Sequence, residues 1–149
     1  MIKEFNNLEE IQKYYDKETN TYIFKEGDKY IDLIKFNFDL VIFSNISALD
    51  VIARKIDAYD IDVWNINAWD IDSHVLRCDD INAWDIKANY IYAENINALN
   101  IYAIDIFYYA VCFAYKSIKC NLIKGSRTNA RHFVLDGFIK TIEFEREDK

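Results

Sequence analysis

The most regular feature of this chain is an apolar residue at every fifth position between residues 45 and 106. A second, mostly small, residue follows two positions after each of them. Helix faces repeat every 3.6 residues and strand faces every 2, so neither element sustains a period of five. The large column is Ile46, Val51, Ile56, Ile61, Ile66, Ile71, Leu76, Ile81, Ile86, Ile91, Ile96, Ile101 and Ile106, and the small column begins Ala48, Ala53, Ala58, Val63, Ala68, Ser73 and Cys78.

A short strand followed by a corner does satisfy a period of five. The large and small residues then both point inward, the residue between them points outward, and the remaining two make the turn. Each pentapeptide becomes one side of a coil, and successive coils stack at the strand spacing of about 4.8 Å. The pattern therefore predicts an all-β protein, a parallel β-helix (β-solenoid) with five-residue sides over residues 45–111.

The segments on either side of the repeat are expected to cap the solenoid, because an open end exposes unpaired backbone and core. Residues 1–44 predict a short helix capped by Asn6 or Asn7, followed by short strands around a hairpin or loop at 25–29. Residues 112–149 predict a second cap with a β-hairpin at Asp136-Gly137, the strongest short-range hairpin signal in the chain. The charged tail, 143–149, is expected to fray.

Composition excludes several function classes. With 149 residues the chain predicts one domain, and its three glycines and lack of proline leave no glycine-rich phosphate loop. The three cysteines, Cys78, Cys112 and Cys120, have no zinc-like spacing and are expected to be reduced, packed thiols. The N-terminus lacks the apolar core of a signal peptide and no apolar run reaches membrane-spanning length, so we expect a cytoplasmic protein that does not contact a membrane.

Acidic residues are concentrated in the repeat. Residues 45–106 contain eleven acidic residues against four basic ones, whereas residues 107–149 contain five against eight. Most of the acids lie directly before or after an inward isoleucine, so they point outward, and stacked coils would place their carboxylates in rows. The basic C-terminal segment would balance this charge within the molecule or at a neighbour's surface, or would contact nucleic acid or phosphate.

Two interpretations of the acidic rows remain open. Asp and Asn share the same positions, and both tolerate the turn geometry that corners without glycine require, so the rows could serve the corners and solubility. Alternatively, the negative surface binds a basic partner. For that second interpretation the candidate acidic face consists of Asp57, Asp60, Asp62, Asp70, Asp72, Asp79, Asp80 and Asp85.

Three tryptophans, Trp64, Trp69 and Trp84, form a candidate aromatic edge in the outward column. Large rigid side chains on an outer corner can be hot spots for a partner, or they can stack along the solenoid and cover backbone. Coils of twenty residues would stack Trp64 under Trp84, whereas coils of fifteen would stack Trp69 under Trp84. The stacking partner therefore reports the number of residues per coil.

The repeat resembles that of the pentapeptide-repeat proteins, over about residues 36–111. The resemblance implies a right-handed, four-sided β-helix with one pentapeptide per side. In that family a small residue precedes the large one by two positions, whereas here large Ile precedes small Ala, as in Ile66-Asn67-Ala68-Trp69-Asp70. This reversed order leaves a four-sided coil and a three-sided coil of fifteen residues both open.

The resemblance also implies a function. Some acidic pentapeptide-repeat proteins resemble double-stranded DNA in size and charge and bind the DNA site of a topoisomerase, and some phage anti-CRISPR proteins are similar to this design. By this resemblance we expect an inhibitor that mimics DNA and binds a basic DNA-binding protein, either a nuclease effector complex or a topoisomerase, in the host cytoplasm if a phage encodes it. It would not bind nucleic acid directly, and an end cap would form a homodimer.

Nothing in the sequence indicates catalysis. His74 and His132 have no nucleophile at suggestive spacing, and the aspartates recur at a structural period, so we expect no enzyme activity, no cofactor and no metal. The alternative function is a structural or self-assembling solenoid whose charges serve solubility and whose caps mediate oligomerisation. A weaker third hypothesis is a small-ligand binder that uses the aromatic edge or a pocket between cap and coil.

Overall fold

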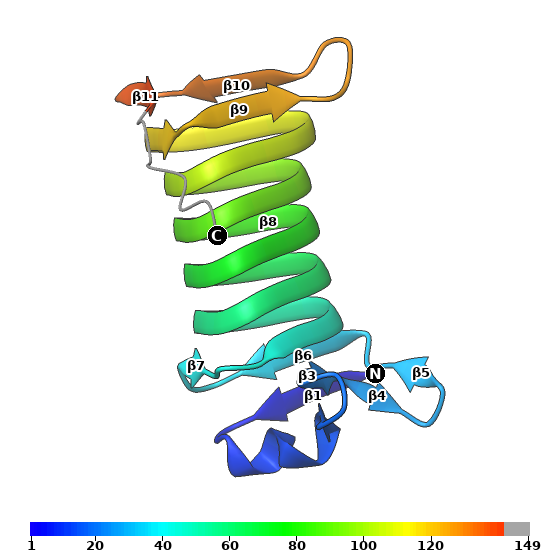
Figure 1. Ribbon diagram of the computed structural model, residues 1–149. Coiled ribbons are helices and arrows are strands. Elements are labelled where there is room, and N and C mark those ends of the chain that lie inside the picture. Colours follow the sequence, from blue (N-terminus) through cyan, green and yellow to red (C-terminus); the bar gives the residue numbers. More distant parts are fainter. Residues whose placement is uncertain (142–149) are drawn as a thin grey trace.

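A parallel β-solenoid of about six turns dominates the computed structural model, which describes residues 1–141 (Figure 1). The charged tail expected to fray, 143–149, lies outside the described residues. The elements in chain order are β1 (Ile2–Phe5), the 3₁₀ helix η1 (Glu9–Tyr14), β2 (Tyr15–Asp16), β3 (Thr21–Ile23), β4 (Lys25–Glu26), β5 (Lys29–Tyr30), β6 (Leu33–Phe36), β7 (Leu40–Val41), β8 (Asn45–Cys120), β9 (Leu122–Gly125), β10 (Arg131–Val134) and β11 (Phe138–Thr141).

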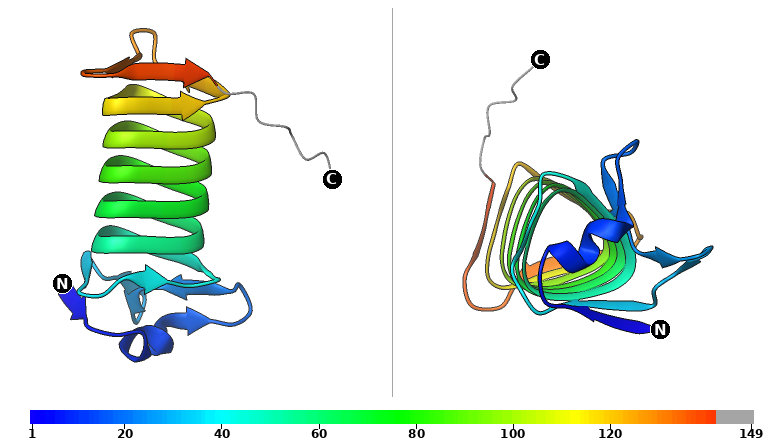
Figure 2. Two further views of the ribbon diagram at one scale, coloured as in Figure 1. Left: turned by 90° about the vertical axis from the view of Figure 1, so that its left-hand side faces the viewer. Right: turned by 90° about the horizontal axis from the view of Figure 1, so that it is seen from below.

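The long strand β8 coils with fifteen residues per turn. Side chains that contact one another from coil to coil are fifteen positions apart: the amide of Asn97 donates to Asn82, and the Trp69 ring stacks on Trp84. Fifteen residues are three pentapeptides, so the coil is three-sided, and the view along its axis shows a triangular outline (Figure 2). Of the two coil lengths that the sequence left open, the shorter is the observed one.

The core is the stack of large and small columns that the sequence predicted. The residues of the large column between 46 and 106 are at most 2% exposed, and most alanines of the small column are also buried. Each isoleucine packs on its counterparts in the coils above and below, and burial of such a side chain stabilises the fold by about 1.5–3 kcal/mol. The alternation of inward and outward residues leaves every intervening polar side chain on the surface.

The solenoid begins before residue 45. Strands β3, β6 and β7 each pair in parallel with the first coils of β8, with Tyr22 opposite Ile46 and Ile34 opposite Val51. Between β3 and β6 the chain leaves the coil as the antiparallel hairpin β4–β5, which confirms the hairpin expected at 25–29. Gly27 in its turn has a φ of 60°, a left-handed conformation that glycine adopts without a steric penalty.

The N-terminal end of the coil is covered. Helix η1 lies across it when the molecule is seen from below (Figure 2, right), and its Ile11 and Tyr14 are buried. Asn7, one of the two predicted capping residues, accepts a hydrogen bond from the backbone N–H of Glu10 at 3.1 Å. An aromatic cluster seals the same end, with the Tyr14 ring 5.1 Å from that of Phe24.

The predicted C-terminal β-hairpin is wrong. Strands β10 and β11 do not pair with each other but continue the coil, and each pairs in parallel with β8. Gly137 lies between them, where a side chain would meet the backbone carbonyl oxygen of Lys116 at 1.7 Å. The Asp136-Gly137 pair is thus a corner that passes close to the coil below, and tertiary contact outweighs the local hairpin preference.

Helices contribute little to the described part of the chain. Across residues 1–141, no helix combines the length and the apolar character that a membrane span requires.

Candidate functional site

The fifteen-residue coil assigns each outward residue to a vertical row, and four of the eight predicted acids gather in two neighbouring rows. Asp57 and Asp72 occupy successive coils of one row, and Asp70 and Asp85 occupy successive coils of the other. The two rows flank the inward Ile71, and three of the four carboxylates line one groove of about 580 Å³. We refer to Asp57, Asp70, Asp72 and Asp85 as the acidic quartet.

In the acidic quartet no amide separates the stacked carboxylates, an arrangement that Asp79 and Glu94 share in another row. In the row of Asp50 and Asp80, by contrast, Asn alternates with Asp: Asn65 donates to Asp50, and Asn95 donates to Asp80, each at 2.8 Å. Two carboxylates about 5 Å apart in water repel by roughly 0.8 kcal/mol. The Asp57–Asp72 and Asp70–Asp85 steps therefore keep a repulsion that the alternating rows avoid, and a bound cation would relieve it.

Lysines partly neutralise this surface. Lys87 Nζ lies 3.4 Å from Asp72, and Lys55 Nζ lies 3.9 Å from Asp57. The Lys87 side chain is 68% exposed and that of Asp72 is 44% exposed. Exposed pairs of this kind contribute only about 0–1 kcal/mol, because water and salt screen them and ordering two long side chains costs entropy. A partner with better-placed donors could therefore displace these lysines.

The other four predicted acids are not part of this cluster. Asp60 lies 3.4 Å from Nδ1 of His74, and Asp80 accepts the hydrogen bond from Asn95. Asp62 and Asp79 are exposed in other rows. The eight acids thus do not share one face, because a three-sided coil distributes them around its axis.

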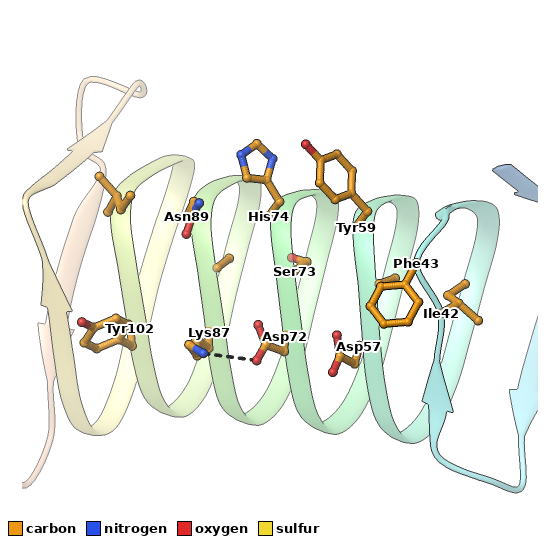
Figure 3. Close-up of a pocket in the computed structure, with 13 residues that line it drawn as sticks. Ile42, Phe43, Asp57, Tyr59, Asp72, Ser73, His74, Lys87, Asn89 and Tyr102 are labelled. Atoms are coloured by element: carbon orange, nitrogen blue, oxygen red, sulfur yellow. Dashed lines mark hydrogen bonds and ion pairs between the residues drawn. The ribbon is translucent and has the colours of Figure 1, made fainter. Parts of the chain in front are cut away.

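A second groove, of about 390 Å³, runs along the coil, shares Asp57 and Asp72 with the quartet and is lined by residues from several consecutive coils (Figure 3). One wall is formed by Asp57, Asp72 and Lys87, and the other by Tyr59, His74 and Asn89. The floor is the small inward column, in which Ser73 lies between Ala58 and Ala88. We refer to this feature as the Ser73 groove.

Ser73 is a buried polar residue that the sequence interpretation did not single out. Its side chain is 7% exposed, and within the described residues its Oγ has no hydrogen-bond partner. The neighbouring His74 does not bond this hydroxyl either, because its ring stacks on Tyr59 and its Nδ1 faces Asp60. Among the described residues, Ser73 therefore lacks the hydrogen bond to a base that activates a serine nucleophile. The available signal was a hydroxyl in a column otherwise filled by alanine on this side.

The three tryptophans of the predicted aromatic edge separate into a pair and a single residue. Trp69 and Trp84 stack with ring centroids 5.1 Å apart and an interplanar angle of 7°, whereas Trp64 lies in another row. All three are more than half exposed. A ladder of amides from Asn67, Asn82 and Asn97 lies beside the pair. The stacking interpretation is confirmed for Trp69 and Trp84. Among residues 1–141, no ring stacks on Trp64.

The three cysteines are free and buried. Burial raises the pKa of the Cys78 thiol to about 12, helped by the charges of Asp79 and Asp80. Burial likewise raises the pKa of Cys112 to about 12 and of Cys120 to about 11. A thiol that resists ionisation is a poor nucleophile and a poor metal ligand. Among residues 1–141, no three His, Cys, Asp or Glu side chains converge as a metal site would require.

Comparisons with family models, with curated proteins and with solved structures find no match to this chain. The class of protein that the fold defines is a three-sided parallel β-solenoid, and its function has to be inferred from the surface.

Proposed function

We propose that this protein is a non-enzymatic binding protein of the pentapeptide-repeat type whose acidic solenoid mimics DNA and occupies the DNA site of a basic protein. One observation carries this proposal: the acidic quartet brings two pairs of stacked carboxylates, each without an intervening amide, together in neighbouring rows along one groove. Solubility alone does not require that arrangement, since Asn alternates with Asp in neighbouring rows. Uncompensated charge in a defined place is what a basic partner would select.

The charge density of the solenoid supports a partial mimic. Residues 45–106 form about four coils, roughly 20 Å of axis at the strand spacing. They carry seven more acidic than basic residues, which is about one net charge per 3 Å, whereas duplex DNA carries one per about 1.7 Å. A partner that binds DNA through counterion release would therefore bind this rod more weakly per unit length, and the quartet would supply the strongest local contact.

The direct test is capture of a partner from host lysate, repeated with rising salt and with competing duplex DNA. We expect a basic DNA-binding protein, of the nuclease-effector or topoisomerase kind, that both treatments release. The variant D57N/D70N/D72N/D85N should lose that partner. Its matched control, D28N/D62N/D79N/E94Q, changes net charge by the same amount outside the quartet and should retain it. Equal loss in both variants would contradict a role for the quartet.

A second candidate function is a self-assembling solenoid, which the C-terminal end favours. Among the described residues at that end, Phe133, Leu135 and Phe138 are between 46% and 65% exposed. Exposed strand edges with apolar side chains are sites of association between chains. Light scattering separates the two functions: oligomers that grow with concentration and dissociate in L135K/F138K would favour assembly, and a monomer at micromolar concentration would oppose it.

A further inference from the structure

We propose that one flat side of the solenoid binds a second copy of this chain in antiparallel orientation. It is the side that carries the acidic quartet, one of the three seen in the view along the axis (Figure 2). The dimer uses a side of the coil and not an end cap. The inference goes beyond the proposed function, which gives no role to the lysines that share this side.

One outward row of this side, which we call the mixed row, changes sign along the coil axis. From the N-terminal end of the coil, the mixed row consists of Asp57, Asp72, Lys87, Tyr102, Lys119 and Lys140. The first four are fifteen residues apart and lie in one line (Figure 3). The next spacing is seventeen, as in the neighbouring row, where Ser117 donates to Asn100 at 2.8 Å. Lys119 and Lys140 are register partners in the last two coils. The row is therefore acidic at one end and basic at the other.

The mixed row is complementary to itself when it is reversed. In a dimer whose two-fold axis lies in the interface and crosses the row at right angles, each residue faces the one equally far from the other end. Asp57 then faces Lys140, and Asp72 faces Lys119. The symmetry makes each of these contacts twice, so the outer parts of the row supply four pairs of opposite charge.

The middle of the side fits the same arrangement. Lys87 faces Tyr102, which is 40% exposed, and an ammonium is attracted to the face of an aromatic ring. In the neighbouring row Asp85 faces Asn100. The Asn100 amide donates one N–H to Asp85 of its own chain at 2.8 Å, and its second N–H is available to Asp85 of the other copy. In neither row do like charges lie directly opposite each other.

Charge also selects the orientation and the partner. Parallel copies in register would place Asp72 on Asp72 and Lys119 on Lys119, and both pairs repel. A DNA mimic needs only the acidic half of the row, and lysines beside it weaken such a mimic. Because the complement of each half lies on the same chain, a second copy is the partner that accounts for both halves.

The size of the side predicts how strong the dimer is. Six coils about 4.8 Å apart, each five residues wide on this side, give a face of roughly 25 Å by 15 Å. Such an area is at the low end for protein interfaces, where association is transient. Partly exposed ion pairs each contribute little and are screened by salt. We therefore expect a weak dimer that dissociates as salt rises, and that covers the same carboxylates as the proposed basic partner.

Sedimentation velocity on the full chain, from micromolar to millimolar concentration at low and high salt, tests the proposal. We expect a monomer–dimer equilibrium at low salt and monomer at high salt. D72K and K119E should each raise the dimer Kd at least about tenfold, because each variant creates two contacts between like charges. An equimolar mixture of D72K and K119E should dimerise again, because each variant then offers the other a complementary charge at both contacts.

Matched controls reverse the same charges on another side of the coil. Asp62 and Lys124 lie in the outward row that includes Phe107, the register partner of Lys124, so D62K and K124E should dimerise like the original chain. A second complementary pair, D57K and K140E, replaces the first if the urea midpoint shows that D72K unfolds. K119E leaves the acidic quartet unchanged, so its loss of the dimer is independent of whether the quartet binds a basic protein.

Three results would overturn the inference. The first is an original chain that stays monomeric at low salt and millimolar concentration. The second is a dimer that both D72K and K119E leave intact, which would place the contact elsewhere, at the C-terminal end if L135K/F138K removes it. The third is a mixture of folded D72K and K119E that stays monomeric, because the two sides would then not face each other in reversed order.

Discussion

Asn95 donates its side-chain amide to Oδ1 of Asp80, the residue fifteen positions earlier and one coil below, at 2.8 Å. The Asn65–Asp50 bond repeats this relation in the same row. In both pairs the amide replaces a repulsion between two carboxylates with a hydrogen bond. The alternation of Asp and Asn is therefore a stabilising ladder on the outside of the coil.

We predict that N95D destabilises the protein by about 1 kcal/mol at low ionic strength, because it loses the hydrogen bond to Asp80 and adds a neighbouring like charge. Part of that loss should be recovered in 0.5 M NaCl, where charges are screened within about 4 Å. Urea unfolding at both salt concentrations measures this change in the free energy of unfolding. The control N67D lies in a row with Ile52 and Asn82 and should be nearly neutral; an equal cost at residue 67 would contradict the ladder.

The tryptophan pair predicts a specific energetic coupling. Because Trp69 stacks on Trp84, a double-mutant cycle of W69A and W84A should give an interaction energy of about 0.5–1.5 kcal/mol. The value should fall at the lower end of that range, since both rings are more than half exposed. The matched cycle of W64A and W84A should give a value near zero. A coupling between Trp64 and Trp84 would indicate twenty residues per coil.

We predict that G137A displaces the terminal coil without unfolding the rest. A Cβ at this position would lie 1.7 Å from the Lys116 carbonyl oxygen, so strands β10 and β11 must move away from β8. Hydrogen exchange should then accelerate in residues 131–141 and remain slow in the middle of β8. In the control G27A nothing lies within 4 Å of the new Cβ and only the positive φ is unfavourable, which costs roughly 1–2 kcal/mol in the hairpin. Unchanged exchange in the terminal coil of G137A would contradict the close approach.

The buried thiols predict a dependence of stability on alkaline pH. The folded pKa of Cys78 and of Cys112 is raised to about 12 by burial, whereas an unfolded thiol titrates near 8.5. The folded state therefore holds its protons more tightly, and this contribution is fully present below pH 8.5 and is lost as pH rises toward 12. The free energy of unfolding should decline over that interval, and less steeply in C78A.

The same burial predicts slow alkylation. At pH 8 the buried thiols should react with iodoacetamide at least a hundredfold more slowly than a free cysteine, because the thiolate is the reactive form. All three should react at the ordinary rate in urea. Fast labelling of Cys78 in the folded protein would contradict the enclosed position of its thiol, which donates to the carbonyls of Trp64 and Asp80.

The candidate site illustrates what a repeat can and cannot predict. That Asp57 and Asp72 point outward follows from their place beside inward isoleucines, and this was predictable. That they are vertical neighbours follows only from a coil of fifteen residues; a coil of twenty would have placed Asp57 under Arg77. That the buried Ser73 hydroxyl has no hydrogen-bond partner among the described residues became visible only in three dimensions.

The amino-acid sequence by itself determined that the chain coils, which residues form the core, and that acidic and aromatic side chains lie outside. A period of five in apolar residues permits few other structures, because only a strand with a corner returns the same side chain inward at that interval. The tertiary structure decided how many sides close one coil, and with it which outward residues meet. Five divides both fifteen and twenty, so the period does not distinguish three sides from four. Packing across the coil axis does distinguish them. The same packing makes Asp136-Gly137 a corner between two sides of the coil, β10 and β11, instead of the turn of a hairpin.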